Sequence, residues 1–359
     1  MRPFLVHVIP TLENAGAETM LARLVEEFDK RGIEQAVLVT KGGITDFFYN
    51  KIASYCPVLL WKKEPQKTIT YLRSHKSNLK LLGWMYGGIF FANYMNFRYR
   101  LAAELVWNIR QSNFLPYQVK QKAALYLFGL ASQLLAPKII YCAYAAERVH
   151  KRFFFGSKRT KVIQNGLAKK ESSSGKRNIE IPPKFLLFVG RYDPIKGIDR
   201  LLRIVAPFFK EHPDYKLIIA GGGWQNGHIP KALHNQVVIL GNVPFVNELY
   251  QKASAYLFTS YFEGFPNVVV EATSNGCPII AFEAGDSASI LKDYALGQTV
   301  TSEKQFLELL FKKTLQPPSQ ETRQEEAKKQ KERFQFKHTV DAYKAFIFET
   351  DYVRNQRIY

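Results

Sequence analysis

Cysteine is scarce in this chain of 359 residues, and the three cysteines present do not form a site. Cys56, Cys142 and Cys277 are odd in number and lie at no spacing used by metal ligands. They therefore indicate neither a disulfide framework nor a zinc site. We therefore expect a protein of a reducing compartment.

Long hydrophobic runs are also missing. The most apolar window, LLGWMYGGIFFANYM at residues 81–95, is shorter than the roughly 18 residues of a membrane span and contains three glycines. We predict a buried strand followed by a helix there. The opening residues, MRPFLVHVIP, lack the long apolar core and cleavage site of an export signal and are typical of a first buried strand. We therefore expect the chain not to be exported.

Negative charge is scarce in the first half of the chain. Residues 1–170 contain 26 Lys and Arg against 10 Asp and Glu, whereas residues 171–359 contain 24 against 21, so the first half carries most of the net charge of +19. The excess indicates an anionic partner, which could be lipid head groups, a phosphorylated acceptor or nucleic acid, or it only makes the surface soluble. Segments 119–138 and 151–161 mix bases with aromatic and aliphatic residues, which favours an anionic membrane surface over nucleic acid.

Short apolar runs separated by helix-length stretches fill both halves of the chain, which is typical of parallel sheets covered by helices. The predicted strands are FLVHVIP, QAVLVT, LKLLGWMY, ELVWNI, KIIYCA and KVIQN, then KFLLFVG, KLIIAGG, QVVILG, ASAYLFTS and CPIIAF. A linker is predicted at 169–183 between the two sets. We therefore predict an α/β protein with two doubly wound domains, residues 1–170 and 171–337, that face each other across a cleft and bind ligands at the carboxyl ends of their strands.

Two strand-to-helix turns have residues suited to phosphate binding. In FVGRYDPIKGIDRLL, residues 188–202, Arg191 and Lys196 can clamp a phosphate beside a helix N-terminus, although two solvated bases in a loop are an equal alternative. In the first half, Ala15-Gly16-Ala17 lets a phosphate or sugar approach the backbone, but small residues are common in such turns.

The stretch YFEGFPNVVVEATSNGCPII, residues 261–280, places Glu263 and Glu271 on either side of a Gly-Phe-Pro turn. Pro266 suits the first position of a helix, which would leave the next backbone N–H groups free for a ligand. Glu271 follows about one and a half turns after it. One carboxylate can face a sugar ring and the other the ribose of a nucleotide, with the diphosphate between them and the upstream bases.

Taken together, these motifs resemble the retaining family 4 glycosyltransferases of the GT-B fold. The resemblance covers nearly the whole chain. The segments that support it are AGAE (15–18), WMYGG (84–88), VWNIRQS (106–112), VIQNGL (162–167), GRYDPIKG (190–197), NELYQKASAYLFTSYFEGFPNVVVEATSNGCPII (247–280) and AGDSASI (284–290). The last of these, together with WNIR, looks like the branch that builds bacterial surface polysaccharides.

The resemblance implies a role for each site residue. Arg191 and Lys196 would hold the diphosphate, and Glu263 would face the donor sugar; these three are the predicted catalytic residues. Arg110 would position donor or acceptor. The predicted nucleotide-sugar-binding residues are Gly16, Gly190, Phe265, Pro266, Asn267, Val268 and Glu271, of which Glu271 binds the ribose. A last helix, at about 338–359, would cross back onto the first domain.

The chain departs from that branch at two positions. Gly87 and Gln111 stand where the branch commonly has histidine, so no histidine is expected to act at either place. The sequence contains no Asp-x-Asp triplet. We therefore expect neither a metal nor another cofactor, with the nucleotide sugar as a co-substrate.

The sequence thus predicts a metal-independent, retaining hexosyltransferase. It would move a sugar from a nucleotide diphosphate, by the family a UDP-sugar, to a lipid-linked or other membrane-associated glycan of a capsule, lipopolysaccharide or similar polymer. It would be cytoplasmic and peripheral on the inner face of the membrane. Two alternatives stay open: a nucleotide-sugar 2-epimerase, whose extra acid and base side chains the sequence does not identify, and a non-catalytic partner subunit of the same fold.

Overall fold

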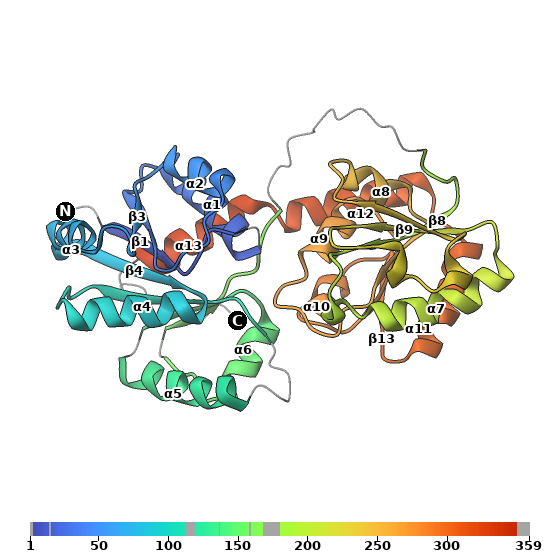
Figure 1. The fold of residues 1–359 in the computed structure, drawn as a ribbon. Helices are drawn as coiled ribbons and strands as arrows, with labels where there is room; N and C mark the ends of the chain where they lie inside the picture. The colour runs from blue at the N-terminus through green and yellow to red at the C-terminus, as the bar shows by residue number, and fades with distance from the viewer. Residues whose placement is uncertain are drawn as a thin grey trace. The chain divides into compact units, whose positions relative to one another are not determined.

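The structure is a computed structural model that describes residues 3–13, 16–112, 119–135, 137–157, 159–167 and 180–349. The chain divides into two compact units (Figure 1). Unit 1 comprises Met1–Gly166 and Phe336–Tyr359, and unit 2 comprises Leu167–Gln335. The boundaries expected from the sequence, after residues 170 and 337, lie a few residues downstream of these. Most of the predicted linker, 169–183, lies outside the described residues.

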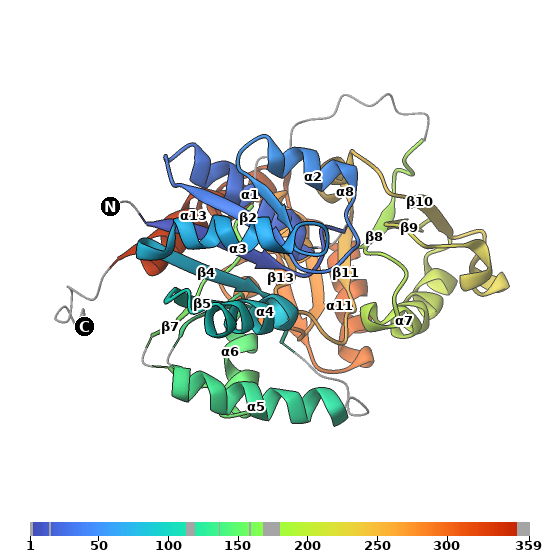
Figure 2. The ribbon, with the colours of Figure 1, turned by 60° about the vertical axis from the view of Figure 1, so that its left-hand side comes forward.

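Unit 1 contains a parallel sheet of seven strands in the order β3-β2-β1-β4-β5-β6-β7. The strands are β1 (Phe4–Ile9), β2 (Gln35–Val39), β3 (Val58–Leu60), β4 (Leu79–Trp84), β5 (Glu104–Ile109), β6 (Lys138–Tyr141) and β7 (Thr160–Val162). The helices between them are α1 (Gly16–Asp29), α2 (Asp46–Ala53), α3 (Pro65–Ser74), η1 (Lys76–Asn78), α4 (Met85–Arg98), α5 (Val119–Leu135) and α6 (Tyr144–Lys151). Figures 1 and 2 show α1 and α2 on one face of this sheet and α4, α5 and α6 on the other.

A helix from the end of the chain, α13 (Phe336–Phe348), packs on the same face of the unit 1 sheet as α1 and α2 (Figure 2). Its buried side chains Val340, Tyr343 and Ile347 join the core formed with β1 and α1. The Tyr343 hydroxyl donates a hydrogen bond of 3.3 Å to Oδ1 of Asn108 at the end of β5. Residues 350–359, the rest of the predicted last helix, lie outside the described residues.

Unit 2 contains a parallel sheet of six strands in the order β10-β9-β8-β11-β12-β13. The strands are β8 (Phe185–Val189), β9 (Lys216–Ala220), β10 (Val237–Gly241), β11 (Ala255–Phe258), β12 (Ile279–Phe282) and β13 (Gly297–Val300). The helices are η2 (Pro194–Lys196), α7 (Ile198–Glu211), η3 (Asn226–His228), η4 (Lys231–Leu233), α8 (Val246–Lys252), α9 (Asn267–Ser274), α10 (Ser287–Leu291), α11 (Glu303–Leu315) and α12 (Gln320–Arg333).

The predicted α/β class is confirmed, since each unit is a parallel sheet covered by helices. Each predicted strand corresponds to an observed one, whereas β3 and β13 were not predicted. The apolar window 81–95 is a buried strand, β4, followed by helix α4, as predicted. Within the described ranges, no helix has the length and hydrophobicity that a membrane span requires.

Candidate active site

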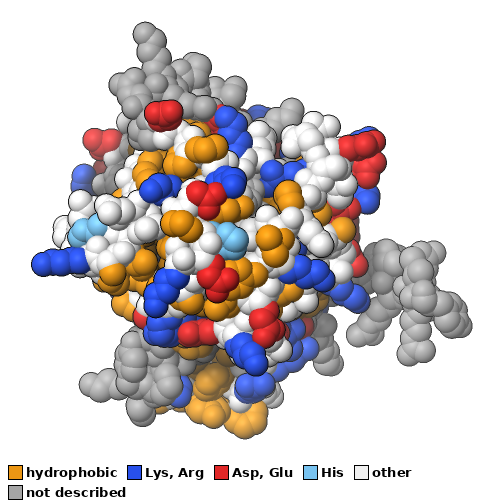
Figure 3. Space-filling model, turned by 90° about the vertical axis from the view of Figure 1, so that its right-hand side faces the viewer, with side chains coloured by type: hydrophobic (Ala, Val, Ile, Leu, Met, Phe, Trp, Pro, Cys, Tyr) orange, Lys and Arg blue, Asp and Glu red, His pale blue; other side chains and the backbone are white. Residues whose placement is uncertain are grey.

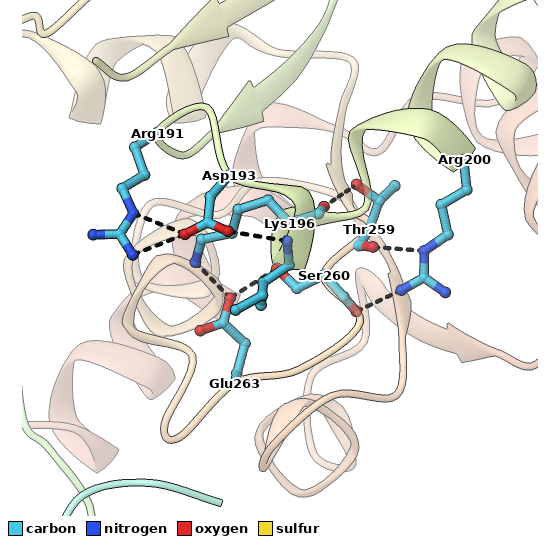
Figure 4. Close-up of polar contacts among 8 residues, drawn as sticks. Arg191, Asp193, Lys196, Arg200, Thr259, Ser260 and Glu263 are labelled. Carbon is cyan, nitrogen blue, oxygen red and sulfur yellow. Dashed lines mark hydrogen bonds and ion pairs between the residues drawn. The ribbon is translucent and has the colours of Figure 1, made fainter. Parts of the chain in front are cut away.

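Two loops meet at the carboxyl ends of adjacent strands in unit 2. The loop 190–197 follows β8 and the loop 259–266 follows β11, and these two strands pair in parallel. The Thr259 hydroxyl donates a hydrogen bond of 2.9 Å to the carbonyl oxygen of Lys196. Gly197, at φ +66°, permits this approach, because a Cβ at that position would lie 2.0 Å from the Thr259 carbonyl oxygen. The two loops therefore form one surface at the sheet edge (Figure 4).

Lys196 and Glu263 are brought together by these loops. The ammonium of Lys196 donates to Oε1 of Glu263 at 2.6 Å, and the Ser260 hydroxyl donates to the same oxygen at 2.7 Å. Both charged side chains are partly buried. Hydrogen bonds between ionised groups are among the strongest in proteins, and partial burial strengthens them further. The pair therefore has a defined position at the end of the sheet before any ligand binds (Figure 4).

Arg191 lies on the same loop as Lys196 but forms a separate ion pair. Its Nη2 and Nε atoms donate to Oδ2 of Asp193 at 2.8 and 3.2 Å. Asp193 also accepts the backbone N–H of Ile195 at 3.1 Å, which caps the turn η2. Arg191 is largely exposed and faces a different carboxylate from Lys196 (Figure 4). The two predicted clamp bases are therefore on one turn, each held by its own acid.

Arg200, on α7, fixes the second loop and was not predicted. Its Nε donates to the carbonyl oxygen of Thr259 at 2.6 Å, and its Nη2 donates to that of Ser260. The guanidinium lies 3.8 Å from the ring centroid of Phe282 and 4.1 Å from that of Tyr261, within the range of cation–π contacts. These contacts hold the backbone that leads to Glu263. In the sequence, only its place four residues after Lys196 could have drawn attention to Arg200. The carbonyl groups to which it donates lie 59 and 60 positions further along the chain.

The helix start near Glu263 differs from the prediction. Helix α9 begins at Asn267, and Pro266 is its N-cap rather than its first residue. The N–H of Asn267 donates to the carbonyl oxygen of Phe265 at 2.9 Å. The prediction that this N–H is free was therefore wrong, because the proline lies outside the helix and the chain turns tightly before it. Val268 lies in the first turn of α9.

Glu271 lies on α9, beyond the loop that contains Glu263. Burial raises the pKa of the Tyr256 hydroxyl well above its usual range, and the negative charges of Glu263 and Glu271 raise it further. Both predicted carboxylates therefore lie close enough to act on the same buried phenol of β11. Burial, with the charges of Tyr256 and then Glu271, likewise raises the pKa of Tyr250.

Two further predicted residues have structural contacts in unit 2. The carbonyl oxygen of Gly190 accepts the indole N–H of Trp224 at 2.9 Å, and the Gly190 N–H donates to the carbonyl oxygen of Ala220 at 2.9 Å. These bonds fix the point where β8 ends. Phe265 is buried, and its ring centroid lies 6.5 Å from that of Phe334. Both residues position the two loops.

Unit 1 has a cavity of about 220 Å³ at the carboxyl ends of β4 and β5. It is lined by Met85, Tyr86, Ile109, Arg110 and Gln111. Met85 adopts a left-handed backbone at φ +56°, which is costly for a residue with a side chain; such residues cluster at active sites and ligand-binding segments. The lining residues come from WMYGG and VWNIRQS, two of the segments that resemble the glycosyltransferases.

Arg110 is held in place by its neighbours but has one buried donor nitrogen for which no acceptor is found among the described residues. Its Nη2 donates to Oδ1 of Asn165 at 2.8 Å, and its guanidinium lies 5.5 Å from the ring centroid of Trp84. Its Nη1 is buried and has no hydrogen-bond partner within the described ranges. Oε2 of Glu18 is likewise buried and unpartnered within them. Burial raises the pKa of Glu18, and the nearby Arg110 charge opposes that rise.

The other predicted positions in unit 1 are Gly16, Gly87 and Gln111. Gly16 begins helix α1; its neighbours 14 and 15 lie outside the described residues. Gly87 packs against Pro10, since a Cβ at Gly87 would lie 2.8 Å from Cγ of that proline. Gln111 is exposed at the cavity.

One histidine contacts the lining of this cavity, and it was not identified from the sequence. The Tyr86 hydroxyl and Nε2 of His150, on α6, form a short hydrogen bond. Nδ1 of His150 lies 2.7 Å from the carbonyl oxygen of Ala146, which can only accept, so Nδ1 carries the ring proton and Nε2 accepts a hydrogen bond from the Tyr86 hydroxyl. Burial lowers the pKa of His150 to about 4, which keeps the ring neutral. The residues at positions 87 and 111 give no indication of the Tyr86–His150 hydrogen bond.

The described residues contain no group of three or more His, Cys, Asp or Glu side chains placed to hold a metal ion.

Comparison with known proteins bears on both the fold and the family. Anabaena HepE in complex with UDP has a TM-score of 0.76 at 16% identity, over 96% of this chain and 98% of that one. The lipopolysaccharide outer core galactosyltransferase WaaB in its apo form has a TM-score of 0.73 at 15% identity, over 96% and 99%. The fold is GT-B. The fold predicted from the sequence is therefore confirmed.

Residues 169–331 match the family model of glycosyl transferases group 1. That stretch contains Arg191, Lys196, Glu263 and Glu271. An uncharacterized glycosyltransferase of Methanocaldococcus jannaschii is 30% identical over 152 residues, which cover 37% of this chain and 39% of that protein. The D-inositol 3-phosphate glycosyltransferase of Corynebacterium kroppenstedtii is 32% identical over 141 residues, or 35% and 31%. The matched part thus spans less than half of these relatives.

Proposed function

We propose that the protein is a retaining, metal-independent glycosyltransferase of family 4. It would transfer a hexose from a UDP-sugar to a lipid-linked or other membrane-associated glycan in the synthesis of a surface polysaccharide. The enzyme would work in the cytoplasm at the inner face of the cytoplasmic membrane. The observation that supports this most directly is the Lys196–Glu263 pair at the carboxyl ends of β8 and β11, inside the stretch that matches the glycosyl transferase family.

The proposed chemistry uses the site of unit 2 to stabilise the leaving group. As the bond between the sugar C1 and the diphosphate oxygen breaks, negative charge grows on the diphosphate. Lys196 and Arg191 would bind that charge, since preorganised cations act most strongly where charge develops. The acceptor oxygen would attack C1 on the face from which the diphosphate leaves, and the departing phosphate oxygen would take the acceptor's proton. The anomeric configuration is thereby retained.

Glu263 would have two roles in this scheme. Without a ligand it neutralises Lys196 at 2.6 Å. With the donor bound, the diphosphate would compete for the ammonium, and the carboxylate would turn to the hydroxyls of the sugar. Glu271 would accept hydrogen bonds from the ribose.

Arg110 would serve the reaction from unit 1. The buried, unpartnered Nη1 atom and the adjacent cavity suit a phosphate or hydroxyl of donor or acceptor, because an unsatisfied buried donor is costly unless a ligand uses it. Gly16 would let a donor phosphate approach the start of α1.

The acceptor class rests on the similar proteins and on charge. WaaB is by name a lipopolysaccharide galactosyltransferase, and Anabaena HepE was solved with UDP and with UDP-glucose. The strongly basic first half of this chain suits an acceptor held at an anionic membrane. A non-catalytic partner subunit and a nucleotide-sugar 2-epimerase are the remaining candidates.

One experiment separates these three functions. The purified chain is incubated with a panel of nucleotide sugars, with and without glycan acceptors, and released nucleotide is measured together with the sugar products. Transfer requires nucleotide release with a glycosylated acceptor. An epimerase gives a C2-epimeric sugar, and a non-catalytic subunit binds nucleotide diphosphate tightly without turnover.

The two glutamates should have separable kinetic effects. We expect Glu263→Gln to lower kcat by about tenfold, the effect of losing one hydrogen bond of about 1.4 kcal/mol in the transition state. The same variant should bind UDP more tightly than the wild type, because Lys196 loses its competing carboxylate. Glu271→Ala should chiefly raise the KM for the donor, because ribose contacts change little between ground and transition states.

Steady-state kinetics and calorimetric titration with UDP measure these effects. Glu303→Gln is the matched control, since Glu303 is a carboxylate of the same unit, at the start of α11, that pairs with Arg203 rather than with Lys196. Unchanged kcat and UDP affinity in Glu263→Gln would show that the carboxylate neither faces the sugar nor competes with the diphosphate.

The stereochemistry and metal requirement form another prediction. We expect an α-linked donor to give an α-linked product, activity to persist in EDTA, and the pH profile to show no limb from an essential histidine near 6.5. Proton NMR of the product and assays after chelation test this. An inverted anomer contradicts the same-face mechanism, and activity that returns only with added metal contradicts the claim that the cations of the chain suffice.

A further inference from the structure

Helix α5 exposes an unusually apolar face in unit 1. Five large side chains on it are substantially exposed: Tyr126 (44%), Leu127 (69%), Leu130 (52%), Leu134 (86%) and Leu135 (53%). The opposite face contains Leu125, which is buried, and Phe128, whose ring lies 6.0 Å from that of Trp107. The helix therefore packs on the unit with one side and presents leucines to the surroundings with the other. Contiguous exposed apolar side chains mark an interaction surface.

The turn after α6 adds an aromatic ring to this face. Phe154 is 56% exposed and has a backbone φ of +62°, a conformation that is rare for a residue with a large side chain. Its ring centroid lies 5.8 Å from that of Tyr126. The amide Nε2 of Gln133 donates a 2.8 Å hydrogen bond to the Phe154 carbonyl oxygen. The aromatic is thus held, at a conformational cost, beside the exposed leucines.

Close packing holds this turn against α5. A Cβ at Gly129 would lie 1.8 Å from the carbonyl oxygen of Phe153, so only glycine permits this contact. The Ser132 hydroxyl accepts the N–H of Gly156 at 3.0 Å. We refer to Tyr126, Leu127, Leu130, Leu134, Leu135 and Phe154 together as the α5 surface.

The segment that contains α5 and α6 is strongly basic. Segment 119–161 contains nine Lys and Arg but one acid, Glu147. Arg148, Lys151, Arg152 and Lys161 are exposed, and the one acid pairs with Lys151 at 3.1 Å. The face drawn in Figure 3 differs, with acidic and basic side chains interspersed.

We propose that the α5 surface docks the chain on an anionic lipid bilayer. Helix α5 would lie in the plane of the membrane, with its leucines and Phe154 in the head-group and acyl boundary. The exposed bases Arg148, Lys151, Arg152 and Lys161 would face acidic head groups. Leucine and aromatic side chains flanked by Lys and Arg are the composition of such in-plane helices. The proposal deepens the proposed role at a membrane, but it requires no donor, acceptor or turnover.

Flotation with lipid vesicles tests the proposal on the full chain. Vesicles of phosphatidylcholine alone are compared with vesicles that also contain phosphatidylglycerol, at low and high salt. We expect binding to the anionic vesicles that weakens as salt rises. The double variant Leu127→Ser with Leu134→Ser should partition about 100-fold less, at about tenfold for each leucine, since each would bury apolar surface in the bilayer.

Leu315→Ser is the matched control, because Leu315 ends α11 in unit 2 and is 70% exposed, much like Leu127. It should bind vesicles as the wild type does. Lys196→Ala should also bind normally, so that failure of the catalytic proposal and failure of this one give different results. Leu130→Trp should show a blue shift of its emission on adding anionic vesicles.

Three outcomes overturn the proposal. Equal vesicle binding by the double variant and the wild type would remove the α5 surface from the contact. Equal binding to vesicles with and without phosphatidylglycerol would remove the role of the bases. Self-association of the wild type without lipid, lost in the double variant, would show that the surface joins two copies of the chain.

Discussion

Lys196→Ala is expected to lower kcat by at least about a hundredfold, the usual effect of removing one preorganised stabiliser of developing charge. The structure adds a second reason. Lys196 neutralises Glu263 at 2.6 Å, so the alanine variant leaves a carboxylate beside the place where the diphosphate must gain negative charge. The affinity for UDP should therefore fall much more than the affinity for uridine.

Arg191→Ala should act in the same direction, with kcat lowered by at least about a hundredfold. Arg191 is exposed and its partner Asp193 also caps the turn η2, so the turn keeps its shape when the guanidinium is removed. The effect then reports the lost charge rather than a changed loop. Calorimetric titration with UDP and uridine, and turnover with the donor found in the panel, provide the measurements.

Lys184→Ala is the matched control for both variants. Lys184 directly precedes β8, at the opposite end of that strand from the loop 190–197, and pairs with Asp214 at the surface. Its removal should leave UDP binding and kcat within about twofold of the wild type, because exposed ion pairs contribute little. Wild-type UDP affinity in both Lys196→Ala and Arg191→Ala would exclude the proposed diphosphate clamp.

The fold was predictable because the strands that form the cores are short apolar runs. Strands β1 and β8 are almost entirely buried, and their sequences, FLVHVI and FLLFV, are clear apolar runs. The two unpredicted strands, β3 and β13, lie at sheet edges and are only three and four residues long. Gly297–Val300 reads GQTV, which contains no apolar run at all.

The site was only partly predictable because contacts between distant segments decide its geometry. Sequence motifs identified Lys196 and Glu263 as separate elements, but their hydrogen bond depends on β8 and β11 being neighbours in the sheet. Arg200 was missed because it donates to the backbone carbonyl oxygens of Thr259 and Ser260. Every residue has a backbone carbonyl, so the residue types at 259 and 260 do not indicate the contact. His150 was missed because the segment that contains it matches no motif.

Unit 1 is expected to lose stability at mildly acid pH because two of its histidines are buried in neutral form. Burial lowers the pKa of His7 and of His150 to about 4 each. Nδ1 of His7 accepts the indole N–H of Trp84 at 3.2 Å, and its Nε2 lies 3.1 Å from Oε1 of Gln35. A protonated His7 would direct a second N–H toward the Trp84 donor. The neutral ring is therefore required by its partners as well as by burial.

The sign of the effect follows from proton binding. An unfolded histidine titrates near 6.5, so between pH 6.5 and 4 the unfolded chain binds protons that the folded chain does not. The stabilisation is present above pH 6.5 and is lost as the pH falls toward 4. From pH 7.5 to 5 each histidine should lower the free energy of unfolding of unit 1 by about 2 kcal/mol, or about 4 kcal/mol together. Glu18, whose pKa is raised by burial, acts in the opposite direction.

Urea unfolding followed by tryptophan fluorescence at pH 7.5 and pH 5 measures the loss. Trp61, Trp84 and Trp107 report on unit 1, and Trp224→Phe removes the signal of unit 2. His7→Gln and His150→Gln each destabilise the unit at pH 7.5 through lost packing, but each should reduce the difference between the two pH values by about 2 kcal/mol. Lost packing lowers the free energy of unfolding at both pH values, whereas lost titration changes only the difference between them. A pH difference that is the same in the wild type and in both variants would show that neither histidine is the group that titrates.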